Sequence, residues 1–79
     1  MRLDKYLKVS RLIKRRTIAK EACEKGRVQI NGKVAKSSSD VKVGDILKLT
    51  FGEKVVEYRV TEVKEHVMKD EAKELYEAL

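Results

Sequence analysis

The fold is decided by residues 14–35, which read KRRTIAKEACEKGRVQINGKVA. The apolar residues of the first half repeat at the spacing of one helix face, and they are Ile18, Ala19, Ala22 and Cys23. They predict a helix over 14–25, and Gly26 behind it suits the left-handed backbone that ends many helices. Asn31-Gly32 then separates two short alternating runs at 27–35, and this dipeptide is the strongest short-range signal for a β-hairpin. The stretch predicts a helix that leads directly into a hairpin.

The segments on either side complete an α+β fold. Leu3 and Leu7 lie four residues apart, which places both on one side of a short N-terminal helix. Later runs alternate between apolar and polar side chains, as half-buried strands do. The expected elements are a helix over 2–9, strands over 46–51 and 55–63, and a C-terminal helix over 70–79. We expect two N-terminal helices packed on a small twisted antiparallel sheet, plus the C-terminal helix, in a single domain over 1–79.

Charge is concentrated in the first half of the chain. The 79 residues carry 19 Lys and Arg against 13 Asp and Glu, a net charge of +6. Residues 1–36 hold twelve basic and three acidic side chains, a net +9, and residues 37–79 hold seven basic and ten acidic, a net −3. A basic cluster on one part of a small domain is the electrostatic signature of phosphate binding. The alternative is a soluble surface that happens to be basic.

Several classes of protein are disfavoured by what the sequence contains. One cysteine, Cys23, permits no disulfide within the chain, and with the lone His66 it gives no zinc ligand set. We expect Cys23 to be a small core residue and His66 a surface residue. No apolar run approaches a membrane span or a signal peptide, and no catalytic set is apparent. We therefore expect a cytoplasmic protein that is not an enzyme and uses no cofactor.

The candidate RNA-binding residues are nine side chains of the first 20 residues. Arginine offers a planar fork that holds phosphate oxygens in pairs and stacks on exposed bases. The nine are Arg2, Lys5, Lys8, Arg11, Lys14, Arg15, Arg16, Thr17 and Lys20. Thr17 has two open roles, a donor to phosphate or a helix cap. The alternative for the whole cluster is a solvated face at a helix junction.

Two further residues have competing interpretations. Asp4 is either a partner of the helix dipole, a salt-bridge partner that orients an arginine, or an acceptor for a ribose hydroxyl, and the structural roles are favoured. Tyr6 is either part of the core or a stacking platform for a base, and the core is favoured.

The ordered set of motifs resembles a known family. They are Arg2-Leu3-Asp4-Lys5-Tyr6-Leu7, Ser10-Arg11, Ala19 with Ala22, Gly26-Arg27-Val28, Ile30-Asn31-Gly32 and Val43-Gly44-Asp45. Together, over residues 2 to about 51, they resemble the S4 RNA-binding domain, whose two-helix motif binds structured RNA. The run Leu12-Ile13-Lys14-Arg15-Arg16-Thr17 and the short length resemble the RqcP family of bacterial ribosome quality-control factors. An acidic helix at 70–79, in place of a long basic tail, favours that family over a related ribosome-binding heat-shock protein.

The resemblance implies a function and a set of partners. It implies a factor that binds rRNA and peptidyl-tRNA on the large ribosomal subunit, beside a factor that recruits alanyl-tRNA, while a stalled chain is tailed without a template. We expect a monomer with no small-molecule substrate. The first alternative is a targeting module for a separate rRNA or tRNA modification enzyme. The second is a binder of anionic membranes, which the short first helix disfavours.

Overall fold

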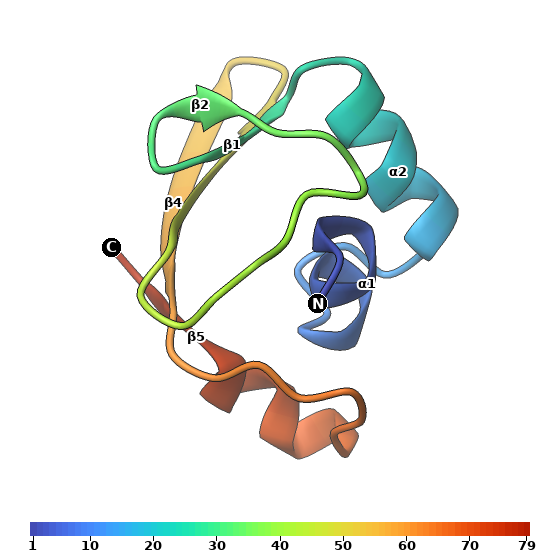
Figure 1. The fold of residues 1–79 in the computed structure, drawn as a ribbon, viewed down its shortest axis with the longest axis vertical. Coiled ribbons are helices and arrows are strands. Elements are labelled where there is room, and N and C mark those ends of the chain that lie inside the picture. Colours follow the sequence, from blue (N-terminus) through green and yellow to red (C-terminus); the bar gives the residue numbers. More distant parts are fainter.

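The computed structural model describes the whole chain, residues 1–79, as helices packed on one antiparallel sheet. In chain order the elements are α1 (Leu3–Val9), α2 (Arg16–Glu24), β1 (Val28–Ile30), β2 (Lys33–Val34), β3 (Ile46–Phe51), β4 (Lys54–Val60), the 3-10 helix η1 (Lys69–Leu75) and β5 (Tyr76–Ala78). The strand order is β2-β1-β3-β4-β5, and every neighbouring pair is antiparallel. Figure 1 shows α1 and α2 on one side of the sheet and η1 at its lower end. The predicted α+β class is confirmed.

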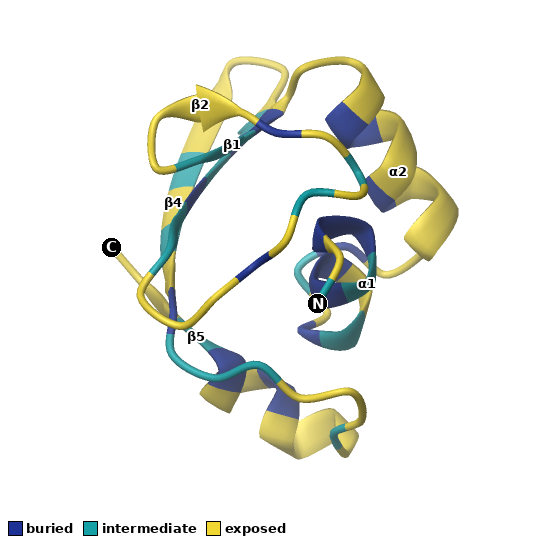
Figure 2. Ribbon diagram, viewed as in Figure 1, coloured by how far each residue is buried: buried dark blue, intermediate teal, exposed yellow.

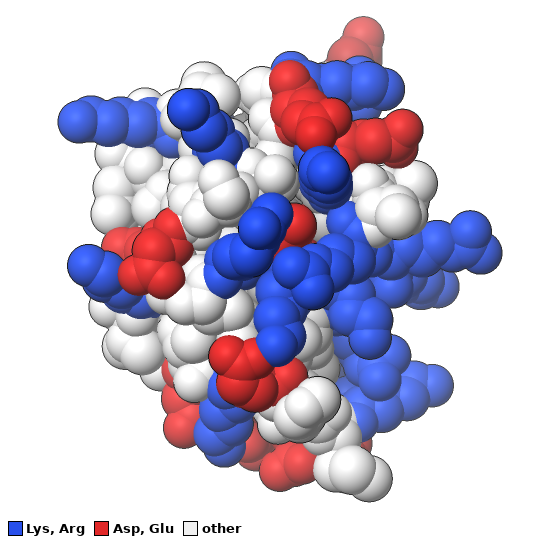
Figure 3. All heavy atoms as spheres, turned by 45° about the vertical axis from the view of Figure 1, so that its right-hand side comes forward, with Lys and Arg blue, Asp and Glu red and all other residues white.

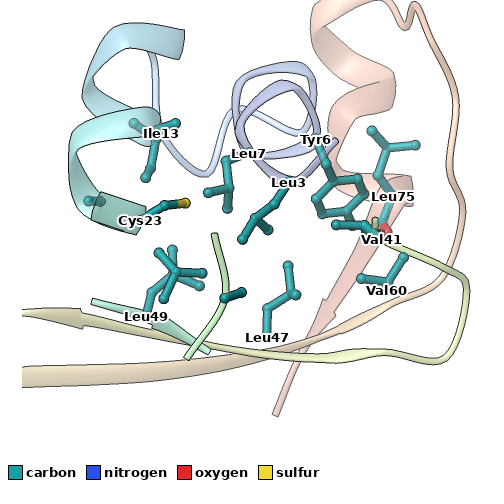
Figure 4. Packing of buried hydrophobic residues seen from close by; sticks show 14 residues of the cluster. Leu3, Tyr6, Leu7, Ile13, Cys23, Val41, Leu47, Leu49, Val60 and Leu75 are labelled. Carbon is teal, nitrogen blue, oxygen red and sulfur yellow. Dashed lines mark hydrogen bonds between the residues drawn. The ribbon is translucent and has the colours of Figure 1, made fainter. Parts of the chain in front are cut away.

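The core lies between α1 and the central strand β3. Leu3, Tyr6 and Leu7 of α1 are fully buried, and so are Leu47 and Leu49 of β3. Figure 4 shows these side chains pointing toward one another between helix and sheet. Figure 2 shows that the buried residues lie on the inner faces of the elements, while the outer face of α2 is exposed. Tyr6 is thus a core residue, as predicted, and the outer faces of both helices are free to carry charge.

The junction of α2 and the hairpin forms as the sequence predicts. Gly26 has φ +71, its N–H donates to the Cys23 carbonyl, and the next N–H donates to the Ala22 carbonyl, both at 3.0 Å. This pair of bonds is the Schellman motif, which satisfies carbonyls that a helix end leaves without a partner. Asn31 and Gly32 both have positive φ, +51 and +84, as a two-residue hairpin turn requires.

One predicted core residue of α2 lies outside the core. Ile18 is 49% exposed, whereas Ala19 and Cys23 are buried at 0% and 3% exposure. Consecutive residues of a helix are rotated by about 100°, so the strip that starts at Ala19 turns Ile18 toward solvent. The expectation that Ile18 belongs to the buried face was wrong. The buried strip uses small side chains, which let α2 approach α1 closely.

The predicted C-terminal helix is present, but it stops short of the predicted bounds of 70–79. A 3-10 helix ends at Leu75, and Tyr76–Ala78 then form strand β5 along the outer edge of β4. The Leu79 N–H also donates to the Glu57 carbonyl at 3.0 Å, and the Tyr76 ring packs edge-on against Tyr58 with centroids 5.1 Å apart. A helix of ten residues is marginal alone, and extending the sheet satisfies backbone groups that β4 would otherwise expose.

A single carbonyl joins the C-terminal segment to α1. The Leu75 carbonyl accepts the Tyr6 hydroxyl at 2.6 Å and the backbone N–H groups of Thr61 and Glu62 at 2.9 and 3.3 Å. Burial raises the pKa of the Tyr6 hydroxyl, and the neighbouring Tyr76 adds to this effect, so the group remains a proton donor. The bond fixes the end of η1 against the helix that carries the basic residues.

Helix α1 ends on an arginine in a left-handed conformation. Arg11 has φ +62, and its N–H donates to the Lys8 carbonyl at 3.1 Å. Residues with a Cβ atom adopt this region at a cost of about 1 to 2 kcal/mol, which is why glycine is the usual choice at such a helix end. An arginine therefore occupies a position where the backbone favours glycine.

Replacing Arg11 with glycine should stabilise the fold, because the left-handed backbone would no longer be strained. We expect Arg11→Gly to raise the free energy of unfolding by about 1 kcal/mol, measured by urea denaturation. Arg27→Gly removes the same charge from a residue outside the left-handed region and is the matched control. A free energy of unfolding for Arg11→Gly at or below that of the unmodified chain would contradict the expectation.

Removing the Tyr6 hydroxyl should weaken the attachment of η1. We expect Tyr6→Phe to lower the free energy of unfolding by about 1 kcal/mol, because a buried hydrogen bond to the Leu75 carbonyl is lost. Tyr58→Phe removes a hydroxyl that makes no hydrogen bond in the structure and should change stability by only a few tenths of that. Equal losses in the two variants would show that the Tyr6–Leu75 bond contributes nothing specific.

Candidate nucleic-acid interface

The candidate interface is organised around one buried carboxylate. The Asp4 side chain is 4% exposed, yet it faces two arginines. Its Oδ1 accepts Arg2 Nε at 3.2 Å and Arg16 Nη2 at 3.4 Å, and its Oδ2 accepts Arg2 Nη2 at 3.3 Å. The Lys5 N–H completes the shell with a 2.8 Å bond to Oδ1. We call Asp4 with Arg2 and Arg16 the Asp4 clamp.

The backbone brings the three residues of the Asp4 clamp together from separate segments. Arg2 precedes α1 in an extended conformation, and Arg16 is the first residue of α2. The loop before β3 fixes the start of α1, because the N–H groups of Leu3 and Asp4 donate to the carbonyls of Ser39 and Ser37 at 2.8 and 3.1 Å. These bonds use donors that a helix start usually leaves free. The basic side chains, rather than the α1 backbone, therefore present the positive charge here.

The surroundings of Asp4 keep it ionised. Burial alone would raise the pKa of Asp4, but the hydrogen bond from Arg2, the Lys5 N–H and the charge of Arg16 together hold it below its ordinary value of 3.8. A buried charge is tolerated only when it is paired and hydrogen-bonded in this way. Of the three interpretations of Asp4, the salt-bridge partner that orients an arginine is confirmed.

Beside the Asp4 clamp lies an open hollow of about 340 Å³, which we call the clamp hollow. Its lining consists of Arg2, Asp4, Arg16, Thr17 and Lys20. Arg2 and Arg16 are each about half exposed, so their outer N–H groups remain available while Asp4 holds their inner ones. Three cations against one carboxylate give the clamp hollow a net charge of +2. Figure 3 shows blue Lys and Arg side chains gathered over the side of the molecule where α1 and α2 lie.

Thr17 contributes a hydroxyl to the clamp hollow and does not cap α2. The N-cap residue is Arg15, and no side chain caps the helix. Thr17 is exposed, and its hydroxyl makes no hydrogen bond within the chain. Of its two open roles, capping is ruled out and the donor to a bound group stays a prediction.

Lys8 and Arg11 lie at a second place, at the other end of α1. They line a smaller hollow of about 70 Å³, which we call the distal hollow, together with Val9, Glu65, His66 and Val67. Lys5 donates to the Glu65 carboxylate, and that bond attaches the segment between β4 and η1 to α1. Lys5, predicted as one of the RNA-binding residues, is thus held in an ion pair, and its contact with RNA stays a prediction.

The remaining predicted residues, Lys14 and Arg15, line neither hollow. Lys14 and Arg15 are exposed and belong to the connection between α1 and α2. No ion pair of the structure includes Lys8, Arg11, Lys14, Arg15 or Lys20. Five cations without an internal partner keep their full charge for an external one.

Two residues of this surface escaped the sequence analysis. Glu65 and His66 follow β4, about 60 positions from the basic cluster, and no local pattern links them to α1. His66 was expected at the surface, which is confirmed, but its place beside Lys8 and Arg11 was not predicted. Only the tertiary fold brings this segment against α1.

The other chemically notable side chain is buried and unreactive. Cys23 is 3% exposed, and burial, with the charges of Asp4 and Glu24, raises the pKa of its thiol to about 11. The predicted role as a small core residue is confirmed. No group of three or more potential metal-ligating side chains occurs, and the helices are too short and too polar to cross a membrane.

Acid should weaken the fold through Asp4. Because the folded-state pKa of Asp4 is lowered, its stabilisation is complete above the unfolded value near 3.8 and is lost as pH falls through the folded value. We expect Asp4→Asn to cost about 2 kcal/mol of unfolding free energy at pH 7 and much less at pH 2.5, by urea denaturation at both pH values. The control is Asp70→Asn, at an exposed carboxyl with no ion pair. A pH-independent cost for Asp4→Asn would contradict this account.

Comparison with known proteins identifies the family. The S4 domain family matches residues 1–47. The chain is 62% identical over 77 residues to the RQC P-site tRNA stabilizing factor of Halalkalibacterium halodurans, covering 98% of this chain and 88% of that protein. It is 58% identical to the factor of the same name from Bacillus subtilis, covering 100% of this chain and 92% of that one.

A solved structure has the same fold over the whole length of this chain. Heat Shock Protein 15 of Vibrio cholerae, described as trimeric, matches with a TM-score of 0.91 at 31% identity and covers 100% of this chain and 81% of that one. The family resemblance drawn from the motifs is confirmed. The chain belongs to the S4 domain family and, within it, to the RQC P-site tRNA stabilizing factors, which are related to heat shock protein 15.

Proposed function

We propose that this protein binds rRNA and peptidyl-tRNA on the large ribosomal subunit during ribosome-associated quality control. In this role it steadies the tRNA while the stalled nascent chain is extended at its C-terminus without a template. The observation that carries the proposal is the Asp4 clamp, which presents Arg2 and Arg16 side by side on the outer surface of the two helices. The protein acts by binding and carries out no chemistry of its own.

The clamp hollow suits an RNA backbone better than a base or a small molecule. Its lining is polar and charged throughout, with no apolar side chain to bury a ring. Guanidinium groups whose inner N–H groups are already held lose little freedom when the outer ones bind phosphate oxygens. Lys20 and the Thr17 hydroxyl add donors at the same place. RNA is recognised largely through phosphates and 2′-hydroxyls, which are the acceptors that such a surface fits.

The relatives support the ribosomal part of the proposal. The RQC P-site tRNA stabilizing factors of Halalkalibacterium halodurans and Bacillus subtilis match this chain over 98% and 100% of its length, so the proposed function concerns the whole chain rather than a shared module. The proposed partners are large-subunit rRNA, peptidyl-tRNA and the factor that recruits alanyl-tRNA. We propose that the protein works as a monomer in the cytoplasm, where ribosomes operate.

Removing two arginines at the start of α2 should release the protein from its RNA. We expect Arg15→Ala/Arg16→Ala to lower the affinity for large subunits that carry peptidyl-tRNA by about tenfold or more, because charged hydrogen bonds to phosphate are lost. The slope of log affinity against log salt should also decrease by about 0.7 for each phosphate contact removed. Both quantities follow from sedimentation binding assays between 50 and 200 mM salt.

A double variant on the other half of the molecule controls for net charge. Lys54→Ala/Lys69→Ala removes the same charge from two exposed lysines outside the helices that carry the basic cluster. It should retain affinity within about twofold. Circular dichroism should show both double variants folded, because without Arg16 the Asp4 carboxylate keeps its bonds from Arg2 and from the Lys5 N–H. Equal weakening by the two double variants, or none by either, would refute binding through this surface.

A further inference from the structure

The distal hollow brings together basic side chains from two parts of the chain. Lys8 and Arg11 come from α1 and the turn that ends it, and His66 comes from the segment after β4. Lys8, Arg11 and His66 are all exposed, and Lys8 and Arg11 have no ion-pair partner. The distal hollow has a volume of about 70 Å³ and is open to solvent, so phosphate oxygens of a bound RNA can reach these side chains.

The one carboxylate of the distal hollow is already engaged. Glu65 accepts a hydrogen bond from the Lys5 ammonium, which holds the pKa of the Glu65 carboxyl below its ordinary value of 4.5. Its charge is therefore constant across neutral and mildly acidic pH, and Lys5 balances it. The charge left for a ligand comes from Lys8 and Arg11, and it increases when His66 binds a proton. The next lysine, Lys64, pairs with Glu62 and adds nothing.

The left-handed backbone conformation of Arg11 indicates that its side chain has a functional role. Arg11 keeps a left-handed conformation, φ +62, at a helix end where glycine would be relaxed. Its guanidinium makes no hydrogen bond within the chain, so the strained conformation secures no internal contact for the side chain. Strain of this kind is often retained where a side chain contacts a ligand.

The distal hollow is separate from the clamp hollow. Arg2 lies before α1 and Arg11 lies after it, and a helix of seven residues between them is about 10 Å long. One phosphate group cannot fill both hollows. An RNA with one phosphate in the clamp hollow would therefore place a different phosphate in the distal hollow.

We propose that Lys8, Arg11 and His66 form a second phosphate subsite, whose affinity for RNA increases when His66 is protonated. The proposal rests on the RNA-binding function proposed above and adds a site at the opposite end of α1. The Lys5–Glu65 ion pair is its positioning contact, since it attaches the His66 segment to α1. Histidine exists in a neutral and a protonated form, whereas arginines and lysines stay charged, so the protonation state of His66 sets the charge of this subsite.

The test measures affinity for large subunits carrying peptidyl-tRNA at pH 6.0 and pH 8.0, at one ionic strength. The unmodified protein should bind about fivefold more tightly at pH 6.0, because one more charged contact to phosphate is present. His66→Gln keeps a polar side chain without the charge and should show at most a small difference between the two pH values. His66→Lys carries the charge at both and should bind tightly at both.

Arg11→Gly separates loss of the subsite from loss of the fold. This variant removes the guanidinium while relaxing the backbone, so a fall in affinity with unchanged or increased stability supports the subsite. Unchanged affinity in Arg11→Gly, or the same pH response in His66→Gln as in the unmodified protein, overturns it.

Arg15→Ala/Arg16→Ala, measured in parallel, shows which proposal fails. If that variant loses affinity while His66→Gln behaves like the unmodified protein, the subsite is wrong and the proposed function stands. If it binds like the unmodified protein, the proposed function fails, and the subsite fails with it.

Discussion

The molecule depends on one buried carboxylate that holds two arginines from different segments. Asp4 lies on the inner side of the basic surface, 4% exposed, and its ionised form is stable only because Arg2, Arg16 and the Lys5 N–H surround it. The same contacts join α1 to the start of α2 and aim two guanidinium groups outward. One interaction therefore sets both the helix arrangement and the direction of charge. Losing either arginine would leave a buried charge short of partners.

The sheet and the C-terminal segment serve as the support for this surface. Leu47 and Leu49 of β3 receive the apolar side of α1, and the Leu75 carbonyl receives the Tyr6 hydroxyl from the same helix. Helix α1 is thus held in three ways. Its apolar face packs on the core, its N-terminus is bonded to the loop before β3, and Lys5 pairs with Glu65 of the segment after β4. A domain of this size has a thin core, so these additional contacts are what make α1 rigid. A rigid α1 keeps the side chains of both hollows in fixed positions for binding.

Local signals made much of the fold predictable, and long-range contacts account for the failures. Gly26 and Asn31-Gly32 determine their own backbone conformations, so the end of α2 and the hairpin follow from the sequence alone. The helical spacing of Leu75 and Leu79 predicted a helix through Leu79, but the chain forms strand β5 after Leu75. Pairing with β4 outweighs the weak preference of a ten-residue segment for helix. The basic cluster supplied the residues that line the clamp hollow, among them Arg2, Arg16 and Lys20, and their contact with RNA stays a prediction. The position of His66 beside Arg11 could be found only from the tertiary structure, because no sequence pattern around His66 predicts a contact with α1.

The most direct test of the central claim is nitrogen-15 NMR of the arginine side chains in the free protein and on addition of tRNA. The Arg2 Nε–H donates to the Asp4 carboxylate, so its signal should exchange slowly with water, and it should do so no longer in Asp4→Asn. On addition of tRNA the side-chain signals of Arg2 and Arg16 should shift together, while that of Arg59 on β4 should not. A fast-exchanging Arg2 signal in the unmodified protein, or shifts confined to other arginines, would contradict the account.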